Sequence, residues 1–166
     1  MQSAYRDLGT FGVEFREGLP QLDEFRNDSL PKLIILDDLM HESTSSDQTV
    51  VQLFTKGSHH RNLSVFFLTQ NLFHQGRGQR DISLNANYIV LFKNPCDKAQ
   101  IEHLVRQIYP ENPLFLQESY RNATANAHGY LVSDLKQSTP DNCQFRANIF
   151  SEGLLPEIAY VPKKKF

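Results

Sequence analysis

The chain has 166 residues, of which 40% are hydrophobic and 22% charged, and a formal net charge of −2. This composition is typical of a folded globular protein of one domain, and it excludes a disordered chain. The net charge also excludes an overall basic field that would attract nucleic acid, so any such binding requires a local basic patch.

Cysteine use and hydropathy indicate the compartment. Cys96 and Cys143 form neither a C-x-x-C motif nor a disulfide-dense pattern, so we interpret both as ordinary thiols in a reducing environment. No apolar segment approaches the length of a membrane span, and the N-terminus does not resemble a signal peptide. We therefore expect an intracellular protein with no membrane contact.

The first half of the chain predicts a strand, a helix and a second strand. A short extended piece at 12–18 precedes the apolar run Leu33–Leu36, and a continuous apolar run is typical of a parallel strand covered on both faces. Ser45 and Gln48 form a capping box for a helix that ends at Gly57.

A second apolar run, Val65–Leu68, follows at the spacing that a parallel crossover requires. The segment 88–94 predicts a third strand of the same kind. Asp97 caps a predicted helix that extends to Ile108, and Asn112 with Pro113 begins another.

Turn residues near the C-terminus predict a terminal antiparallel hairpin. The apolar segments 129–135 and 143–150 flank the sequence Pro140-Asp141-Asn142, which favours a tight turn. We expect one domain over residues 1–155 and a loose basic tail over 156–166.

Polar residues follow both predicted parallel strands. Asp37 and Asp38 end the first strand, and Gln70 follows the second, so the crossover predicts that they share the carboxyl edge of the sheet. Asp37 could hold Mg²⁺ through water, Asp38 could act as the base that activates a water, and Gln70 could orient that water or contact a γ-phosphate. The alternative is that the acidic pair only begins a turn.

Two loops contain further candidate residues. Arg61 lies just before the second strand and is a candidate arginine finger for a neighbouring subunit; the alternative is a solvated loop residue. We interpret the adjacent His59 and His60 as loop residues, because adjacent side chains diverge and no further ligand completes a zinc site.

The segment 74–80 predicts a flexible basic loop, whose Arg77 and Arg80 could contact DNA phosphates in a central pore. A plain surface loop is the alternative. The terminal sequence 162–166, Pro-Lys-Lys-Lys-Phe, could act as a nuclear-import signal or remain a solvated end.

The sequence KLIILDDLM, followed by a helix and GSHHRNLSVFFLTQNLF, resembles the Walker B and sensor strands of FtsK/HerA-type P-loop ATPases. It is most similar to the viral genome-packaging branch found in poxviruses and Polinton-like elements, and the flanks EFREGLPQLDEF and GYLVSDLKQSTPDNCQFRANIF resemble the same branch. Many relatives have Asp-Glu where this chain has Asp37-Asp38.

The resemblance implies an α/β fold, namely the mostly parallel RecA/ASCE-like sheet of a P-loop NTPase with helices on both faces, incomplete at its N-terminus. It further implies ATP and Mg²⁺ as cofactors and double-stranded DNA, capsid or portal proteins and a homo-oligomeric ring of five or six subunits as partners. The nucleus or a cytoplasmic virus factory would be the location.

The chain contains no G-x-x-x-x-G-K-[ST] motif, whose backbone amides and lysine hold the phosphates in such enzymes. We therefore expect the C-terminal part of an ATP-driven DNA-packaging motor, inactive alone, whose phosphate-binding segment lies outside this chain. The alternatives are a non-catalytic DNA- or capsid-binding module and a metal-dependent nuclease, which would need a further acidic ligand near Asp37.

Overall fold

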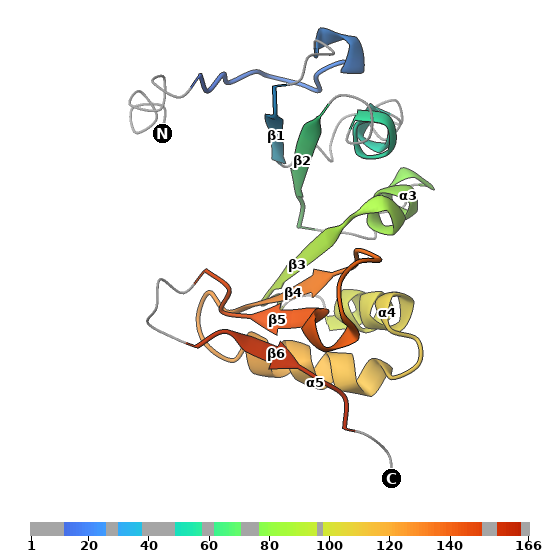
Figure 1. Cartoon of the computed structure of the whole chain (residues 1–166), viewed down its shortest axis with the longest axis vertical. Helices are drawn as coiled ribbons and strands as arrows, with labels where there is room; N and C mark the ends of the chain where they lie inside the picture. The colour runs from blue at the N-terminus through green and yellow to red at the C-terminus, as the bar shows by residue number, and fades with distance from the viewer. Residues whose placement is uncertain are drawn as a thin grey trace. The chain divides into compact units, whose positions relative to one another are not determined.

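The computed structural model describes residues 12–25, 30–37, 49–57, 62–70, 77–95, 98–150 and 156–163. The chain forms two compact units, residues 1–69 and residues 70–166 (Figure 1). The N-terminal unit contains a parallel pair of strands, and the C-terminal unit contains an antiparallel sheet.

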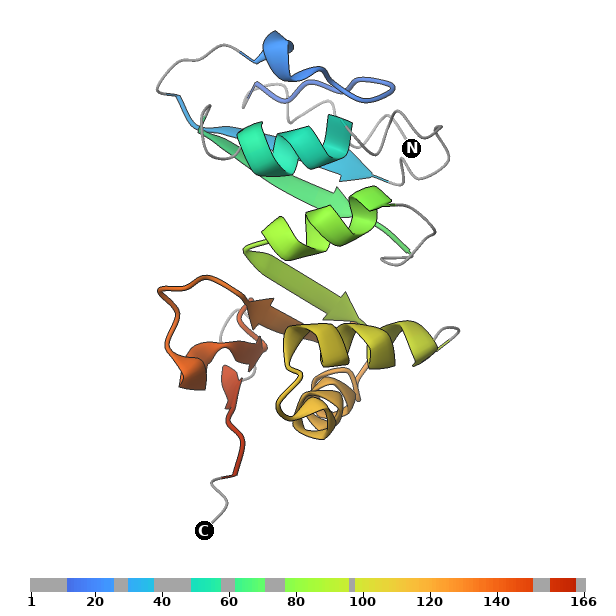
Figure 2. The same cartoon turned by 90° about the vertical axis from the view of Figure 1, so that its right-hand side faces the viewer.

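The N-terminal unit is built on strands β1 (Lys32–Asp37) and β2 (Leu63–Leu68). They pair in parallel, with Asp37 aligned with Leu68, and their arrowheads point the same way in Figure 2. This pairing confirms the crossover that the two apolar runs predict. Between them the chain is helical from residue 49, and its last turn is the π-helix η4 (Leu53–Gly57).

One face of this two-stranded sheet is buried and the other is exposed. Leu36 and Leu63 are buried together with Val50 and Leu53 of the helical segment, which forms the core of the unit. Side chains alternate between the two faces of a strand. The opposite face therefore presents large apolar side chains to solvent, namely Leu33, Ile35, Phe66 and Leu68.

The segment before β1 has no regular secondary structure at residues 13–16 and contains one turn of 3-10 helix, η2 (Leu22–Glu24). No ladder pairs it with either strand in the described part of the unit. The strand-like piece expected at 12–18 is therefore not a strand, and its backbone is irregular. Gly12 and Gly18 adopt positive φ values, which favour glycine.

The C-terminal unit begins with helix α3 (Arg77–Asn85) and then strand β3 (Tyr88–Phe92). Helices α4 (Lys98–Ile108) and α5 (Pro113–Ala123) follow. The chain then forms the strands β4 (Tyr130–Asp134), β5 (Phe145–Ala147) and β6 (Ile158–Tyr160), with the 3-10 turn η5 (Asp141–Cys143) before β5.

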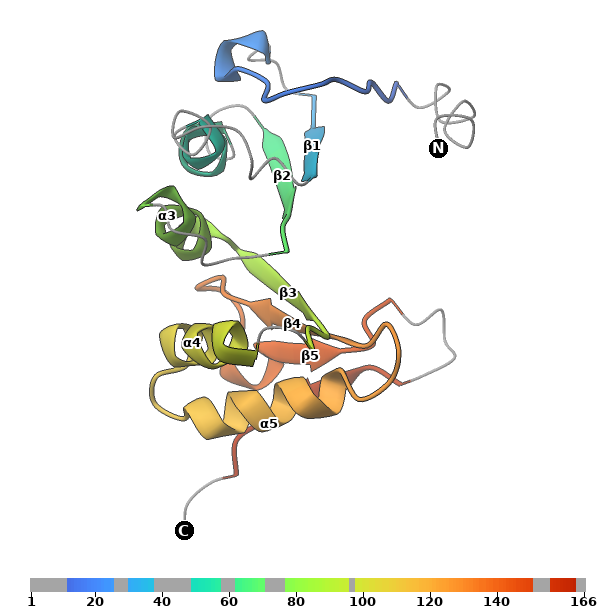
Figure 3. The same ribbon diagram turned by 180° about the vertical axis from the view of Figure 1, so that it is seen from behind.

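The four strands form an antiparallel sheet in the order β3-β4-β5-β6, and α4 and α5 pack on one of its faces (Figure 3). The core lies between these helices and the sheet and consists of Leu91, Ile101, Leu104, Val105, Leu116, Tyr120, Leu131 and Phe145. This apolar cluster is the main source of stability of the unit.

Local sequence accounts for the bounds of α5. The Asn112 side chain accepts a hydrogen bond from the Phe115 N–H at 3.2 Å, and Pro113 occupies the first turn, where its missing N–H is not needed. At the other end of the helix, Thr124 Oγ1 donates to the Tyr120 carbonyl at 2.8 Å. The expected start of this helix at Asn112–Pro113 is confirmed.

The predicted mostly parallel P-loop sheet with helices on both faces is wrong. Among the described strands only β1 and β2 are parallel, and β3 pairs antiparallel with β4 in a separate sheet. The apolar run Tyr88–Phe92 suggested a strand buried on both faces, but Tyr88, Val90 and Phe92 are largely exposed. Composition identified the strand, whereas the direction of its neighbour depends on a segment some 40 residues later.

Two expectations about the C-terminal segment have different outcomes. The terminal hairpin is confirmed, because β4 and β5 pair antiparallel across the 135–144 connection. The tail expected to be loose instead contributes β6, which pairs with β5. The Tyr160 hydroxyl donates to Asn122 Oδ1 of α5 at 2.7 Å, so this short strand is held by a helix as well as by its neighbour.

Candidate functional site: the carboxyl ends of β1 and β2

Asp37 is the last residue of β1 and is exposed. Asp37 is two residues after Ile35 and four after Leu33, so its side chain lies on the same exposed face of the sheet as theirs. Because β1 and β2 are parallel and in register, their carboxyl ends meet at one edge, where Thr69 and Gln70 directly follow Leu68. In the ladder Asp37 is aligned with Leu68, so the acidic end of β1 lies beside the end of β2.

Of the other predicted site residues, the structure describes some and not others. Asp38 and Arg61, like His59 and His60, lie outside the described residues. Gln70 is exposed and is the first residue of the C-terminal unit, whereas Asp37 belongs to the N-terminal unit. The structure thus aligns the ends of β1 and β2. The roles of Asp37, Asp38, Arg61 and Gln70 stay predictions.

The expected basic loop at 74–80 is partly helical. Residues 77–80 form the beginning of α3, and residues 74–76 lie outside the described part of the chain. The backbone of Arg77 and Arg80 is therefore held by a helix in place of the expected flexible loop, and their predicted contact with DNA stays a prediction.

Asp37 suits a magnesium ion that keeps most of its water ligands. Mg²⁺ is commonly held by one or two carboxylates together with water and substrate phosphates, so an exposed strand-end carboxylate meets the minimum requirement. No group of three His, Cys, Asp or Glu side chains suited to a metal occurs among the described residues.

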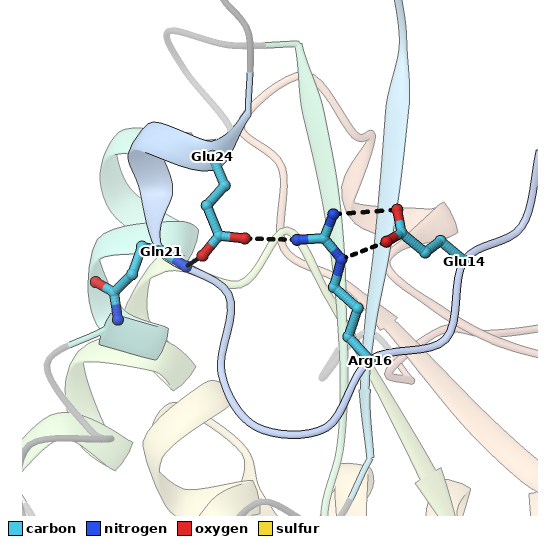
Figure 4. Close-up of polar contacts among 4 residues, drawn as sticks. All are labelled: Glu14, Arg16, Gln21 and Glu24. Carbon is cyan, nitrogen blue, oxygen red and sulfur yellow. Dashed lines mark hydrogen bonds and ion pairs between the residues drawn. The ribbon is translucent and has the colours of Figure 1, made fainter.

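The segment before β1 contains a polar cluster that the sequence did not reveal (Figure 4). Arg16 Nε donates to Glu14 Oε1 at 2.8 Å, and its Nη1 contacts Glu24 Oε2 at 2.5 Å. Glu24 Oε1 in turn accepts the Gln21 N–H at 2.7 Å. The guanidinium therefore contacts two carboxylates and links Glu14 to Glu24.

We expect this cluster to respond to pH. The hydrogen bond and charge of Arg16 lower the pKa of Glu14 below its ordinary value of 4.5. A carboxyl with a lowered pKa in the folded state stabilises the fold above its unfolded pKa, and that contribution is lost as the pH falls through the folded pKa. An NMR titration of the Glu14 side chain should therefore show a pKa below 4.5.

The matched control is Arg16→Gln, which should return the pKa of Glu14 to its ordinary value. Both side chains are more than half exposed, so added salt should reduce the shift. An unchanged pKa of Glu14 in the Arg16→Gln variant would contradict the assignment.

A second ionic cluster lies on the face of the antiparallel sheet opposite α4 and α5. Asp134, whose side chain is 5% exposed, is 3.5 Å from Arg146 Nη2 and 3.9 Å from Lys136 Nζ. Arg146 also reaches Glu157 at 3.1 Å. Lys136 lies 4.7 Å over the Tyr88 ring, and its hydrogen bond to Tyr88 raises the pKa of Lys136.

Strand register explains why sequence analysis missed this cluster. Asp134 and Arg146 lie on neighbouring strands, in a register that aligns Arg146 with Val132, two residues before Asp134. No spacing within the sequence predicts that the two side chains are close. Because a nearly buried carboxylate is costly without a cation, we assign the cluster a structural role.

No described helix combines the length and apolar character that crossing a bilayer requires. Searches of protein-family models, curated proteins and solved structures found no match to the chain.

Proposed function

We propose that this chain is the acidic-strand portion of an ATP-driven motor that moves double-stranded DNA into a viral or virus-like capsid. The observation that carries the proposal is the in-register parallel pair β1–β2, which ends on Asp37 and is followed by Thr69 and Gln70. Ligands of parallel α/β sheets bind beyond the carboxyl ends of the strands. The sequence likeness described above supplies the identity of the motor.

In the proposed motor each predicted site residue has one task. Asp37 would hold the magnesium that accompanies ATP, and Gln70 would orient the attacking water. Asp38 would accept the proton of that water, and Arg61 would act on the nucleotide of a neighbouring subunit. The bound ion would neutralise charge on the transferring phosphoryl group.

The phosphates need a second anchor in this proposal. The sequence has no glycine-rich lysine loop, so another segment or subunit would supply the backbone amides that hold the triphosphate. The chain alone would then bind nucleotide weakly, through its magnesium, and would turn it over poorly. Full hydrolysis would require the complementing segment.

Nucleotide binding tests the role of Asp37. We expect the full chain to bind a fluorescent ATP analogue weakly in the presence of Mg²⁺, and we expect Asp37→Ala to weaken that binding at least tenfold because the ion loses its carboxylate. Titration monitored by fluorescence anisotropy, with and without EDTA, measures the effect.

The matched control is Asp81→Ala, which removes an exposed carboxylate from α3 in the other unit. It should leave nucleotide binding unchanged. Binding that is equal in Mg²⁺ and in EDTA, or equally weakened by both substitutions, would contradict the proposal.

The second candidate is a non-catalytic DNA- or capsid-binding module. It is favoured by the C-terminal unit, which has an apolar core of its own and does not include Asp37. Retention of duplex DNA that falls with added salt and is unchanged by Asp37→Ala would support this module. Metal-dependent cutting of DNA without nucleotide would instead indicate the nuclease.

A further inference from the structure

The C-terminal sheet has two edges, and they differ in their protection against further strands. β6 has only three residues. A lysine and a proline, which hinder strand addition, follow both edge strands within three residues, namely Pro162 and Lys163 after β6 and Lys93 and Pro95 after β3. β3 has five residues, all of them apolar or aromatic, with no proline, lysine, glycine or bulge. Its only hydrogen-bonded neighbour among the described strands is β4.

Ladder geometry shows which backbone groups of β3 face outward. The Leu135 N–H donates to the Asn87 carbonyl at 2.8 Å, which makes Asn87 and Leu135 a hydrogen-bonded pair. Such pairs alternate along an antiparallel ladder. Ile89 and Leu91 therefore direct their backbone groups to β4, whereas Tyr88, Val90 and Phe92 direct theirs away from it.

The β4–β5 ladder independently supports this alternation. The Asp134 N–H donates to the Gln144 carbonyl at 2.8 Å, so Asp134 directs its backbone to β5 and not to its β3 partner, Tyr88. At the far end of β3, the Phe92 carbonyl accepts the Tyr120 hydroxyl at 3.1 Å. That helix side chain pairs with the last outward acceptor. Among the described residues of the C-terminal unit, the edge without a strand partner therefore extends from Tyr88 to the Phe92 N–H.

The side chains on this edge are also exposed. Tyr88, Val90 and Phe92 retain 49%, 44% and 60% of their accessible surface, although each belongs to a β-forming residue type that is usually packed. Together they present roughly 300 Å² to solvent, against the roughly 800 Å² per partner of a stable protein interface. This edge is therefore too small to hold a second folded copy by itself.

We propose that the outer edge of β3 is a docking site for an extended apolar segment of another polypeptide, which adds a fifth strand to the sheet. Only an extended backbone can pair with donors and acceptors repeated at every second residue of a strand. The added strand places one row of side chains beside Tyr88, Val90 and Phe92. Apolar, β-branched residues suit that row because its neighbours are apolar.

Amide hydrogen exchange on the full chain tests the proposal without knowledge of the natural partner. The probe is the capped peptide acetyl-Lys-Val-Thr-Val-Thr-Val-Lys-amide. At ten times its Kd, exchange at the Tyr88, Val90 and Phe92 amides should slow about tenfold, while the Ile89 and Leu91 amides, already bonded to β4, should change little.

Two controls separate strand addition from general stickiness. Val90→Lys places a charge on the docking edge and should weaken peptide binding at least tenfold, whereas Ala159→Lys, at an exposed position of β6, should not. The same peptide with its three valines N-methylated should not slow exchange, because it lacks the amide donors of one edge.

Three outcomes would overturn the proposal. The first is unchanged exchange at the three outward amides at a saturating peptide concentration. The second is peptide binding that survives Val90→Lys. The third is exchange at these amides that is already slow without peptide and becomes slower as the protein concentration rises. That result would identify a second copy of the chain as the occupant. The result does not depend on nucleotide binding, so the two proposals can fail separately.

Discussion

Replacing Phe145 with alanine should lower the free energy of unfolding of the C-terminal unit by about 3–5 kcal/mol. Phe145 is 1% exposed and belongs to the core between the sheet and its two helices. Its ring meets Tyr109 edge-on, with the centroids 5.4 Å apart, and Phe115 with the centroids 6.1 Å apart. The substitution therefore leaves a cavity and removes two aromatic contacts.

Urea unfolding monitored by far-ultraviolet circular dichroism measures this loss as a lower midpoint at an unchanged slope. Leu114→Ala is the matched control, because Leu114 is 71% exposed on α5, and it should change stability by no more than about 0.5 kcal/mol. Equal effects of the two substitutions would show that the assigned core is wrong.

The second large effect is expected at Gly129, which lies just before β4 and donates its N–H to the Asn126 carbonyl at 3.2 Å. A Cβ atom at this position would overlap the Ala123 carbonyl oxygen and approach Thr124 Cα to 3.1 Å. Both neighbours are backbone atoms at the end of α5, so no change of rotamer relieves the overlap. We expect Gly129→Ala to cost about 3 kcal/mol.

The adjacent residue provides the control. His128 has a φ of +61°, a conformation that glycine adopts without steric cost. His128→Gly should therefore leave stability within about 0.5 kcal/mol of the original, because relief of strain offsets the greater freedom of the unfolded chain. Thermal unfolding of both variants tests the contrast, and a mild effect of Gly129→Ala would show that the chain relaxes around the added carbon.

Local signals predicted those elements whose cause is local. Asn112 and Pro113 were sufficient to locate the start of α5, because an N-cap side chain and a proline act within one turn. The parallel pair β1–β2 was also predictable, since two apolar runs separated by a helix require a crossover. This pair is also what aligned Asp37 with the end of β2.

Features that depend on distant partners were not predictable. The run Tyr88–Phe92 specifies a strand, but β4 determines its direction, and β4 differs little in composition from a parallel strand. β6 is too short to show a periodic pattern in the sequence. It forms because it pairs with β5 and because the Tyr160 hydroxyl donates a hydrogen bond to Asn122 of α5. The Asp134–Arg146 contact likewise arises from register between strands.

The order of strands in the C-terminal sheet has a consequence for synthesis on the ribosome. β3 is made before α4 and α5, and its partner β4 emerges about 40 residues later, which at typical translation rates means a delay of several seconds. β4 and β5, by contrast, are close in sequence and can zip together quickly. During that interval the apolar strand β3 of the nascent chain has no β4 to pair with. A chaperone that binds β3 would therefore raise the yield of the native sheet.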